Sequence, residues 1–139
     1  MNALVDTTIW SLALRRKQDD LNVAEQTVVT ELNDLVKEGR ARIIGPIRQE
    51  LLSGIRNVMQ YEKIRTSLRA FRDEAIDTSD YEAAAKANNE CRARGVGVTA
   101  VDILICAVAA RREWTIFSSD PDFERYAKVL PITLHKPRQ

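Results

Sequence analysis

Short apolar runs alternate with stretches of helical spacing along the whole chain. Ala3, Leu4 and Val5 form a run that is too brief for a helix, whereas Ile9, Trp10 and the leucines after them have the spacing of an amphipathic helix. The same alternation continues to the C-terminus. It predicts strands at 3–5, 41–45, 74–77, 114–118 and 131–134, and helices from Ile9 onward and at 22–37, 46–52, 58–71, 79–94, 99–112 and 120–127.

Local start and stop signals mark several of these boundaries. Gly39 fits the end of a helix, and Pro46 suits a first helical turn, where its missing N–H costs little. Ser79, followed three residues later by Glu82, matches a capping box, in which two side chains bind free backbone N–H groups at a helix start. The fifth helix is therefore expected to begin at Ser79.

Strands separated by helices predict an α/β fold with a mainly parallel sheet of about five strands, covered by helices on both faces. The length of 139 residues fits one compact domain spanning residues 1–139. In such a sheet, the C-terminal ends of the strands and the N-termini of the helices share one edge. Ligands bind at that edge, near the point where the strand order reverses.

Composition narrows the class of protein without fixing its function. Hydrophobic residues make up 45% of the chain and charged residues 29%, and the two kinds are interspersed, which supports a packed core and argues against disorder. Cys91 and Cys106 are too few for a disulfide framework, and both are expected to be reduced thiols in a cytoplasmic protein. Neither a signal peptide nor an apolar run of about 18 residues is present, so no membrane association is expected.

Three acids are expected at the ligand-binding edge of the sheet. Asp6 follows the first strand, Asp120 follows the fourth strand, and Asp102 lies in the first turn of the sixth helix. Carboxylate oxygens are hard ligands suited to Mg²⁺ or Mn²⁺, whereas a single histidine near the C-terminus makes a zinc site improbable. If these three acids and Glu50 together surround a metal, the rest of the surface is mildly basic, which suits a phosphate backbone. An ordinary mixed surface, consistent with the net charge of +1, is the alternative.

Each of these acids also has a purely structural interpretation. Asp6 is placed to cap the first helix, Asp120 stands before a proline as a helix cap does, and Asp102 is placed to close a capping box with Thr99. Taken singly, each acid is better explained as a cap. Two observations weaken that explanation jointly. The helix that carries Asp102 is apolar all round and hence buried on most sides, and all three acids fall on the same edge.

Two further acids are candidates on weaker grounds. Glu50 lies near the apolar face of its helix, between Ile47 and Leu51, and a solvated helical glutamate explains it equally well. Asp122 follows Asp120 by two residues and fits either a supporting acid or another ligand.

Four segments that contain these acids together resemble the PIN domain family, and in particular the VapC-type toxins of type II toxin–antitoxin systems. The resemblance covers nearly the whole chain. No single segment is decisive, but four in the right order make a strong signal. The segments are Leu4-Val5-Asp6-Thr7-Thr8-Ile9-Trp10, Arg48-Gln49-Glu50-Leu51-Leu52-Ser53-Gly54, Thr99-Ala100-Val101-Asp102-Ile103-Leu104-Ile105-Cys106-Ala107-Val108-Ala109 and Phe117-Ser118-Ser119-Asp120-Pro121-Asp122-Phe123-Glu124.

The resemblance implies a three-layer α/β/α sandwich and a Mg²⁺- or Mn²⁺-dependent endoribonuclease, which hydrolyses RNA phosphodiesters with a metal-activated water. It also implies a toxin that forms homodimers and is inhibited by a small cognate antitoxin. By the family pattern, the catalytic acids are Asp6, Glu50, Asp102 and Asp120. Of these, Asp6, Asp102 and Asp120 are the expected metal ligands.

Supporting roles are expected beside the four acids. Thr7 resembles the small hydroxyl residue that follows the first acid in the family, and Asp122 remains a supporting acid. Ser118 resembles the hydroxyl residue before the fourth acid, although threonine often starts that motif.

Other functions and partners stay open at this stage. A non-catalytic PIN-like module that binds RNA or a partner, and a housekeeping PIN nuclease, are the alternatives to a toxin. An aspartyl phosphatase would need a second aspartate two residues after Asp6, where Thr8 stands. Apolar residues of the second and fourth helices fit either core packing or a partner surface; these are Val28, Val29, Leu32, Met59, Ile64 and Leu68.

Overall fold

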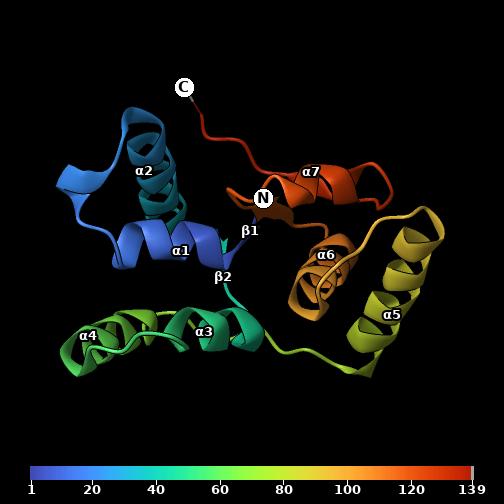
Figure 1. Ribbon diagram of the computed structural model, residues 1–139, viewed down its shortest axis with the longest axis horizontal. Helices are drawn as coiled ribbons and strands as arrows, with labels where there is room; N and C mark the ends of the chain where they lie inside the picture. The colour runs from blue at the N-terminus through green and yellow to red at the C-terminus, as the bar shows by residue number, and fades with distance from the viewer. Residues whose placement is uncertain (139) are drawn as a thin grey trace.

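The computed structural model describes residues 1–138, which form four parallel strands connected by helices (Figure 1). The strands are β1 (Ala3–Val5), β2 (Ala41–Arg42), β3 (Thr115–Phe117) and β4 (Thr133–Leu134). The α-helices are α1 (Thr7–Leu14), α2 (Val23–Lys37), α3 (Gly45–Leu52), α4 (Val58–Leu68), α5 (Thr78–Ala93), α6 (Ala100–Arg112) and α7 (Asp122–Ala127), and a 3₁₀ helix spans Gln18–Asp20.

The order of the strands in the sheet is β2-β1-β3-β4. Ala3 of β1 pairs with Ala41 of β2 on one side and with Thr115 of β3 on the other. The chain moves outward from β1 to β2 and then returns across β1 to form β3. The strand order therefore reverses between β1 and β3, and the crevice at the C-terminal ends of these two strands is where a ligand is expected.

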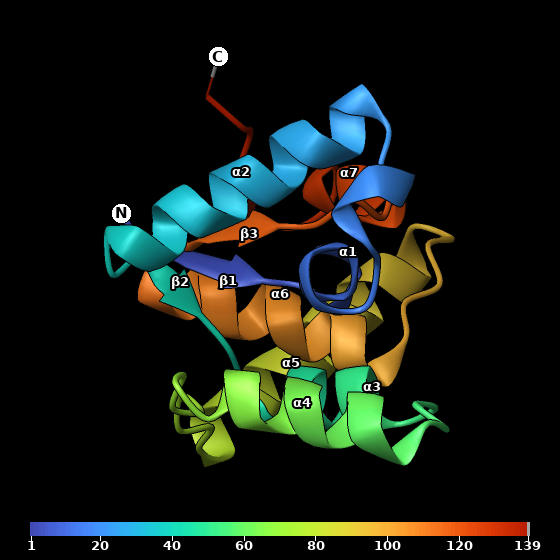
Figure 2. The same cartoon turned by 90° about the vertical axis from the view of Figure 1, so that its left-hand side faces the viewer.

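Helices cover both faces of the sheet. Figure 2 shows α2 and α7 on one side of the strands and α6 on the other, with α5 beyond α6. Helix α6 contacts β1 and β3 directly and packs against α5. This arrangement confirms the predicted α/β class and its three layers, with four strands in place of about five.

The fifth strand is missing because the segment predicted at 74–77 does not pair. Asp73 makes only an isolated parallel bridge with Ile43, and the N–H of Glu74 donates to the Ile43 carbonyl at 2.9 Å. The chain must then turn away to start α5, where the side chain of Asp77 caps the helix. The prediction of a strand at 74–77 was wrong because an apolar segment becomes a strand only where it pairs along the edge of another strand, and here the pairing stops after one bridge.

The capping box of α5 lies two residues before the predicted one. Ser79 and Glu82 were the predicted pair, whereas the structure uses Asp77 and Asp80, each accepting from the other's N–H at 3.0 Å. The fully buried carboxyl of Asp80 also accepts two hydrogen bonds of 2.9 Å from the Arg112 guanidinium of α6. A contact from a distant helix therefore selects the start of α5.

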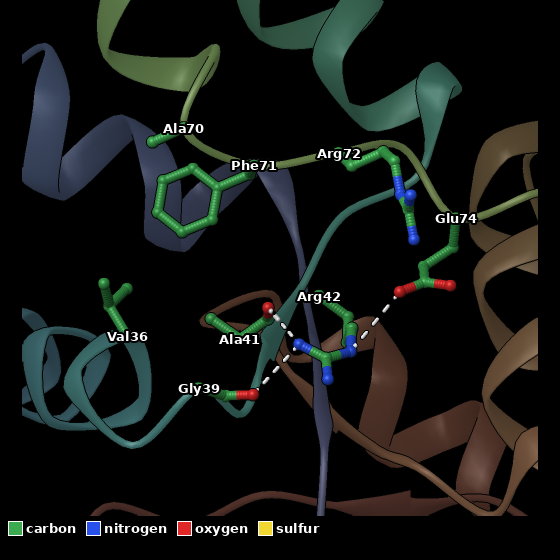
Figure 3. A pocket seen from close by; sticks show the side chains of 8 residues that line it. All are labelled: Val36, Gly39, Ala41, Arg42, Ala70, Phe71, Arg72 and Glu74. Atoms are coloured by element: carbon green, nitrogen blue, oxygen red, sulfur yellow. Dashed lines mark hydrogen bonds and ion pairs between the residues drawn. The ribbon is translucent and has the colours of Figure 1, made fainter.

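Strand β2 lies at one edge of the sheet, and Arg42 covers part of its open side (Figure 3). The Arg42 guanidinium donates to the carbonyls of Gly39 at 3.0 Å and Ala41 at 3.1 Å, and it pairs with Glu74 at 3.3 Å. Unpaired edge groups invite pairing with other chains, so this arrangement protects the sheet. The same residues border a cleft of about 450 Å³ between the end of α2, β2 and the segment after α4.

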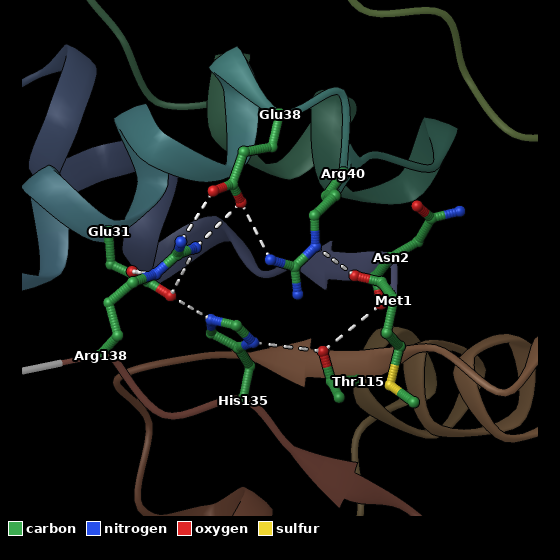
Figure 4. A network of polar contacts seen from close by, with 8 residues as sticks. All are labelled: Met1, Asn2, Glu31, Glu38, Arg40, Thr115, His135 and Arg138. Atoms are coloured by element: carbon green, nitrogen blue, oxygen red, sulfur yellow. Dashed lines mark hydrogen bonds and ion pairs between the residues drawn. The ribbon is translucent and has the colours of Figure 1, made fainter.

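The C-terminal segment is held in place by a buried carboxylate, Glu31 of α2 (Figure 4). Glu31 pairs with the imidazole of His135 and, at 2.9 Å, with the guanidinium of Arg138, which also pairs with Glu38 at 2.7 Å. Burial alone would raise the pKa of Glu31, but the hydrogen bonds from His135 and Arg138 lower it. This network fixes the chain that follows β4 against α2.

The interior is dominated by α6, whose residues 103–109 are all buried between the sheet and α5. No helix within residues 1–138 is both long and apolar enough to cross a membrane.

Val29, Leu32, Ile64 and Leu68 also enter the core, whereas Met59 is 83% exposed. Of the apolar residues that fit either packing or a partner surface, these four therefore take the packing role.

Asp80→Asn is expected to lower the free energy of unfolding by roughly 2 kcal/mol at pH 7, because Arg111 and Arg112 lose a buried counter-charge. Arg112 lowers the pKa of Asp80, so this stabilisation is present above the ordinary pKa near 4 and is lost as the pH falls. Urea unfolding at pH 7 and pH 3 measures it. The control Asp19→Asn, at an exposed position, should change stability by less than about 0.5 kcal/mol. Equal midpoints for both variants at pH 7 would contradict the prediction.

Candidate functional site

Asp6 stands at the junction of β1 and α1, beside the point where the strand order reverses. Its N–H donates to the carbonyl of Phe117 in β3 at 2.9 Å, and its carbonyl accepts from the N–H groups of Ile9 at 3.1 Å and Trp10 at 3.3 Å. The indole N–H of Trp10 donates back to the carbonyl of Val5 at 3.0 Å. The backbone of Asp6 is therefore fixed by the strand before it and by the helix after it.

The carboxyl of Asp6 is buried and is held by hydroxyl groups. Its Oδ2 accepts from Ser118 Oγ at 2.7 Å and from Thr8 Oγ1 at 3.0 Å. Ser118 Oγ in turn accepts from the N–H of Asp120 at 3.0 Å, and Thr8 Oγ1 accepts from the N–H of Ser119 at 3.0 Å. Asp6 occupies the N-cap position of α1, but its carboxyl is held chiefly by the two hydroxyls and not by a capping hydrogen bond.

Asp102 lies in the first turn of α6 and forms one half of the predicted capping box. Its N–H donates to Thr99 Oγ1 at 3.1 Å. Its carboxyl is engaged elsewhere, because Oδ2 accepts from the hydroxyl of Tyr126 in α7 at 3.1 Å. This hydrogen bond therefore connects the start of α6 to α7, the helix that follows the C-terminal end of β3.

Asp120 combines a capping role with a place at the same edge. Its Oδ1 accepts from the N–H of Asp122, the first residue of α7, at 2.9 Å, although the N-cap residue is Pro121 and not Asp120 as the structural interpretation expected. Its N–H is bonded to Ser118, which links Asp120 to the carboxyl of Asp6 through one hydroxyl. The carboxyl of Asp122 pairs with Arg125 on its own helix at 3.3 Å.

Glu50 and Thr7 are less constrained. Glu50 is exposed on α3 and makes no ion pair within residues 1–138, but its charge acts on Asp102. The hydroxyl of Thr7 is buried and has no hydrogen-bond partner in the described chain. The threonine hydroxyl that contacts Asp6 is that of Thr8, so the supporting role of Thr7 stays a prediction.

Three of the four acids act on the fourth, Asp102. Its pKa is raised to about 6, chiefly by burial and further by the negative charges of Asp6, Asp120 and Glu50, against a hydrogen bond from Tyr126 that lowers it. Burial also raises the pKa of Asp6, which the hydroxyls beside it partly oppose. No basic side chain of residues 1–138 forms an ion pair with any of these four acids.

The chemistry of these donors fits a hard divalent cation. The donors are carboxylate oxygens, the ligands that Mg²⁺ and Mn²⁺ prefer, and their negative charge has no protein cation to balance it. Within residues 1–138, no three acidic, imidazole or thiol side chains stand close enough to hold one ion directly. Binding one ion between them therefore requires a carboxyl group to turn, or a water molecule between ligand and ion.

Two side chains of this site had no place among the predicted residues. Thr8 was passed over in favour of its neighbour Thr7, since sequence alone does not show which of two adjacent hydroxyls turns toward Asp6. Tyr126 is buried, and its contact with Asp102 joins two helices that are separated by β3. The sequence does place this tyrosine one turn after Phe123 on a short amphipathic helix. That position is equally typical of a residue that packs in the core, so it did not indicate a contact with Asp102.

Comparison with known families identifies a match that covers most of the chain. The PIN domain family model matches residues 3–129. No curated protein matches the chain in sequence. The matched segment contains all four predicted acids, and the match confirms the resemblance to PIN domains that the four sequence segments indicate.

Several solved structures share this fold at low sequence identity. FitAcB from Neisseria gonorrhoeae matches with a TM-score of 0.76 and 21% identity, covering 97% of both chains. VapBC2 from Rickettsia felis, bound to a DNA fragment from its promoter, matches with a TM-score of 0.73 and 17% identity, covering 97% of this chain and 98% of that one. A toxin–antitoxin complex from Klebsiella pneumoniae matches with a TM-score of 0.65 and 17% identity, covering 88% and 90%.

Asp102→Asn is expected to stabilise the protein at alkaline pH in the presence of EDTA. Because its pKa is raised to about 6 on folding, Asp102 favours the folded state in acid and opposes it as the pH rises from about 4 through 6. One pKa unit corresponds to about 1.4 kcal/mol, and the partly exposed carboxyl should deliver roughly 1–2 kcal/mol in total at pH 8. The gain should vanish near pH 3.5.

Thermal and urea unfolding of the wild type and Asp102→Asn across this pH range provide the test. Asp19→Asn, at an exposed position outside the site, should show no comparable pH-dependent gain. A variant that is less stable than the wild type at pH 8 would show that Asp102 is a structural cap and not a repelled site carboxylate.

Proposed function

Because the chain belongs to the PIN domain family, we propose that it is a Mg²⁺- or Mn²⁺-dependent endoribonuclease and the toxin of a toxin–antitoxin pair. PIN domains are in general nucleases. The observation that carries the proposal is that Asp6, Asp120 and Glu50 all act electrostatically on the half-buried Asp102, while no protein cation pairs with any of the four acids within residues 1–138. Acids left unpaired in a partly buried site favour a bound divalent ion over a structural role.

Each acid has a distinct part in this proposal. Asp6 and Asp102 ligate the ion directly, and Asp120 ligates it directly or through water. Glu50, being exposed on α3, ligates through water or orients the attacking water. The cation, when bound, lowers the pKa of a coordinated water toward about 7 and so supplies the nucleophile for the phosphodiester.

The remaining residues keep the acids in position. The Ser118 hydroxyl joins the carboxyl of Asp6 to the backbone of Asp120, so the ends of two strands hold a fixed spacing. The Tyr126 hydroxyl orients the carboxylate of Asp102 from α7. Thr7 and Asp122 stay as supporting residues in the proposal, Asp122 by starting α7 beside Asp120.

The toxin role rests on fold similarity to chains of known toxin–antitoxin complexes. Under this proposal the protein acts on RNA in the cytoplasm, forms a homodimer and is inhibited by a small antitoxin. Val58 and Met59 at the start of α4 are 74% and 83% exposed, and exposed apolar pairs of this kind are suited to a protein partner.

Two alternatives make different demands on the same site. A binding module without catalysis does not need four unpaired acids, and the retention of all four favours the enzyme. A housekeeping PIN nuclease would share the chemistry but would lack toxicity and a dedicated inhibitor.

Purified protein, freed of any antitoxin, is expected to cleave single-stranded RNA with Mg²⁺ or Mn²⁺ and to stop when EDTA is added. Asp6→Asn and Asp102→Asn should each reduce the cleavage rate by at least about 100-fold, because each removes a ligand charge. Asp19→Asn is the matched control and should cleave like the wild type. Gel analysis of labelled RNA measures the rates. Cleavage that persists in EDTA, or at wild-type rate in Asp102→Asn, would refute the metal mechanism.

Induced expression in a bacterial host should arrest growth within a few generations if the protein is a toxin, because RNA cleavage blocks translation. Asp102→Asn, expressed to the same soluble level, should leave growth unaffected. Colony counts and culture density measure the effect. Normal growth with soluble wild-type protein that cleaves RNA in vitro would favour the housekeeping nuclease.

A further inference from the structure

A cleft lies between α4 and α3, the helix that also carries Glu50. It has a volume of about 380 Å³ and is lined by Gly45, Arg48, Gln49, Leu52, Ser53 and Tyr61; we refer to it as the α3–α4 cleft. The two helices contact each other and lie side by side in both views (Figures 1 and 2). Gly45, which lines the cleft, is the first residue of α3 and follows β2, so one end of the cleft lies toward the sheet edge where the strands end, and Glu50 lies on the adjacent side of the same helix.

The side chains of the α3–α4 cleft combine an aromatic ring with unused hydrogen-bonding groups. Tyr61 supplies the ring and Leu52 adds an apolar wall. Within residues 1–138, neither the side-chain amide of Gln49 nor the hydroxyl of Tyr61 forms a hydrogen bond. Ser53 Oγ, by contrast, is already engaged by the carbonyl of Gln49 at 2.7 Å. A glutamine amide offers a donor and an acceptor side by side, which matches the edge of a nucleobase.

The walls of the cleft are held in place before any ligand arrives. Arg48 donates to the carbonyls of Leu68, at 3.0 Å, and Phe71, and it pairs with Asp73 at 2.9 Å. These bonds tie α3 to the end of α4 and to the segment that follows it. A preformed cleft loses less entropy on binding, so a modest set of contacts gives measurable affinity.

The larger cleft beside β2 lacks these properties. There Arg42 is committed to the carbonyls of Gly39 and Ala41 and to Glu74, as Figure 3 shows. That cleft lies along the edge strand, and none of its lining residues adjoins one of the four acids in sequence. The α3–α4 cleft is therefore the better candidate for contact with a substrate.

We propose that the α3–α4 cleft binds one unpaired nucleobase of the RNA substrate next to the cut site, with Tyr61 as the stacking face and Gln49 as the group that reads the base edge. Unpaired bases stack on aromatic side chains and are read through their exposed edges, whereas paired bases are shielded. The proposal rests on the proposed ribonuclease function. It adds that cleavage depends on the base at one position near the cut.

Binding in EDTA separates recognition from cleavage. Fluorescence anisotropy with a labelled single-stranded RNA should show roughly tenfold weaker binding for Tyr61→Ala than for the wild type, and near-wild-type binding for Tyr61→Phe, which keeps the ring. Tyr81→Ala is the matched control, since Tyr81 is 56% exposed on α5, outside the cleft. Circular dichroism confirms that each variant is folded. Equal affinity for Tyr61→Ala and the wild type would overturn the proposal.

Sequencing of the cleavage ends tests the role of Gln49. With Mg²⁺ or Mn²⁺ and a pool of random RNA, Gln49→Ala should change the base preference at one position near the cut. Gln49→Glu, which replaces the donor with a charged acceptor, should alter that preference in another direction. Gln18→Ala, at an exposed position, is the control. Unchanged preferences in both Gln49 variants would overturn the reading role.

The two proposals fail separately. If the wild type does not cleave RNA but Tyr61→Ala still binds single-stranded RNA more weakly, the cleft assignment stands and the ribonuclease function falls. If the wild type cleaves RNA and the cleft variants bind and cut as it does, the ribonuclease stands and the cleft assignment falls.

Discussion

A buried carboxylate at the end of the central strand is the constraint on which the site depends. Removing the charge of Asp6 from water is costly, and the structure offsets that cost with hydroxyl groups and not with a cation. Neutral donors stabilise the carboxyl without cancelling its charge. The arrangement holds Thr8 and Ser118 against each other across more than a hundred residues, so the polar contacts also join β1 to β3 at their C-terminal ends.

Several basic side chains elsewhere in the described chain are engaged by acids outside this site. Arg48 is paired with Asp73, the buried Asp80 engages arginines of α6, and Glu31 engages the C-terminal segment. Each of these pairs stabilises a junction between elements. The four acids of the proposed site, by contrast, form no ion pair within residues 1–138. Under the proposed function, a divalent ion would supply the positive charge that the protein does not.

The sequence predicted the features that depend on local pattern or on the logic of a parallel sheet. Apolar runs and helical spacing located the elements, and strand ends placed Asp6 and Asp120 on one edge. Features that depend on a distant partner were missed. The start of α5 is set by Arg112, and Tyr126 reaches Asp102 from a helix that follows another strand. Such contacts have no signature in the neighbouring residues, because the partners meet only after the sheet has formed.

Glu50 shows most clearly where local reasoning stops. Its spacing on α3 was equally compatible with a solvated surface position, and only the family pattern made it a candidate. The structure explains why its place matters, since α3 follows β2 directly and therefore starts at the same edge as α1 and α7. One side of α3 carries the acid that acts on Asp102, and the adjacent side borders the α3–α4 cleft. A single short helix thus links the proposed chemistry to the proposed recognition of a base, so a shift of α3 would disturb both together.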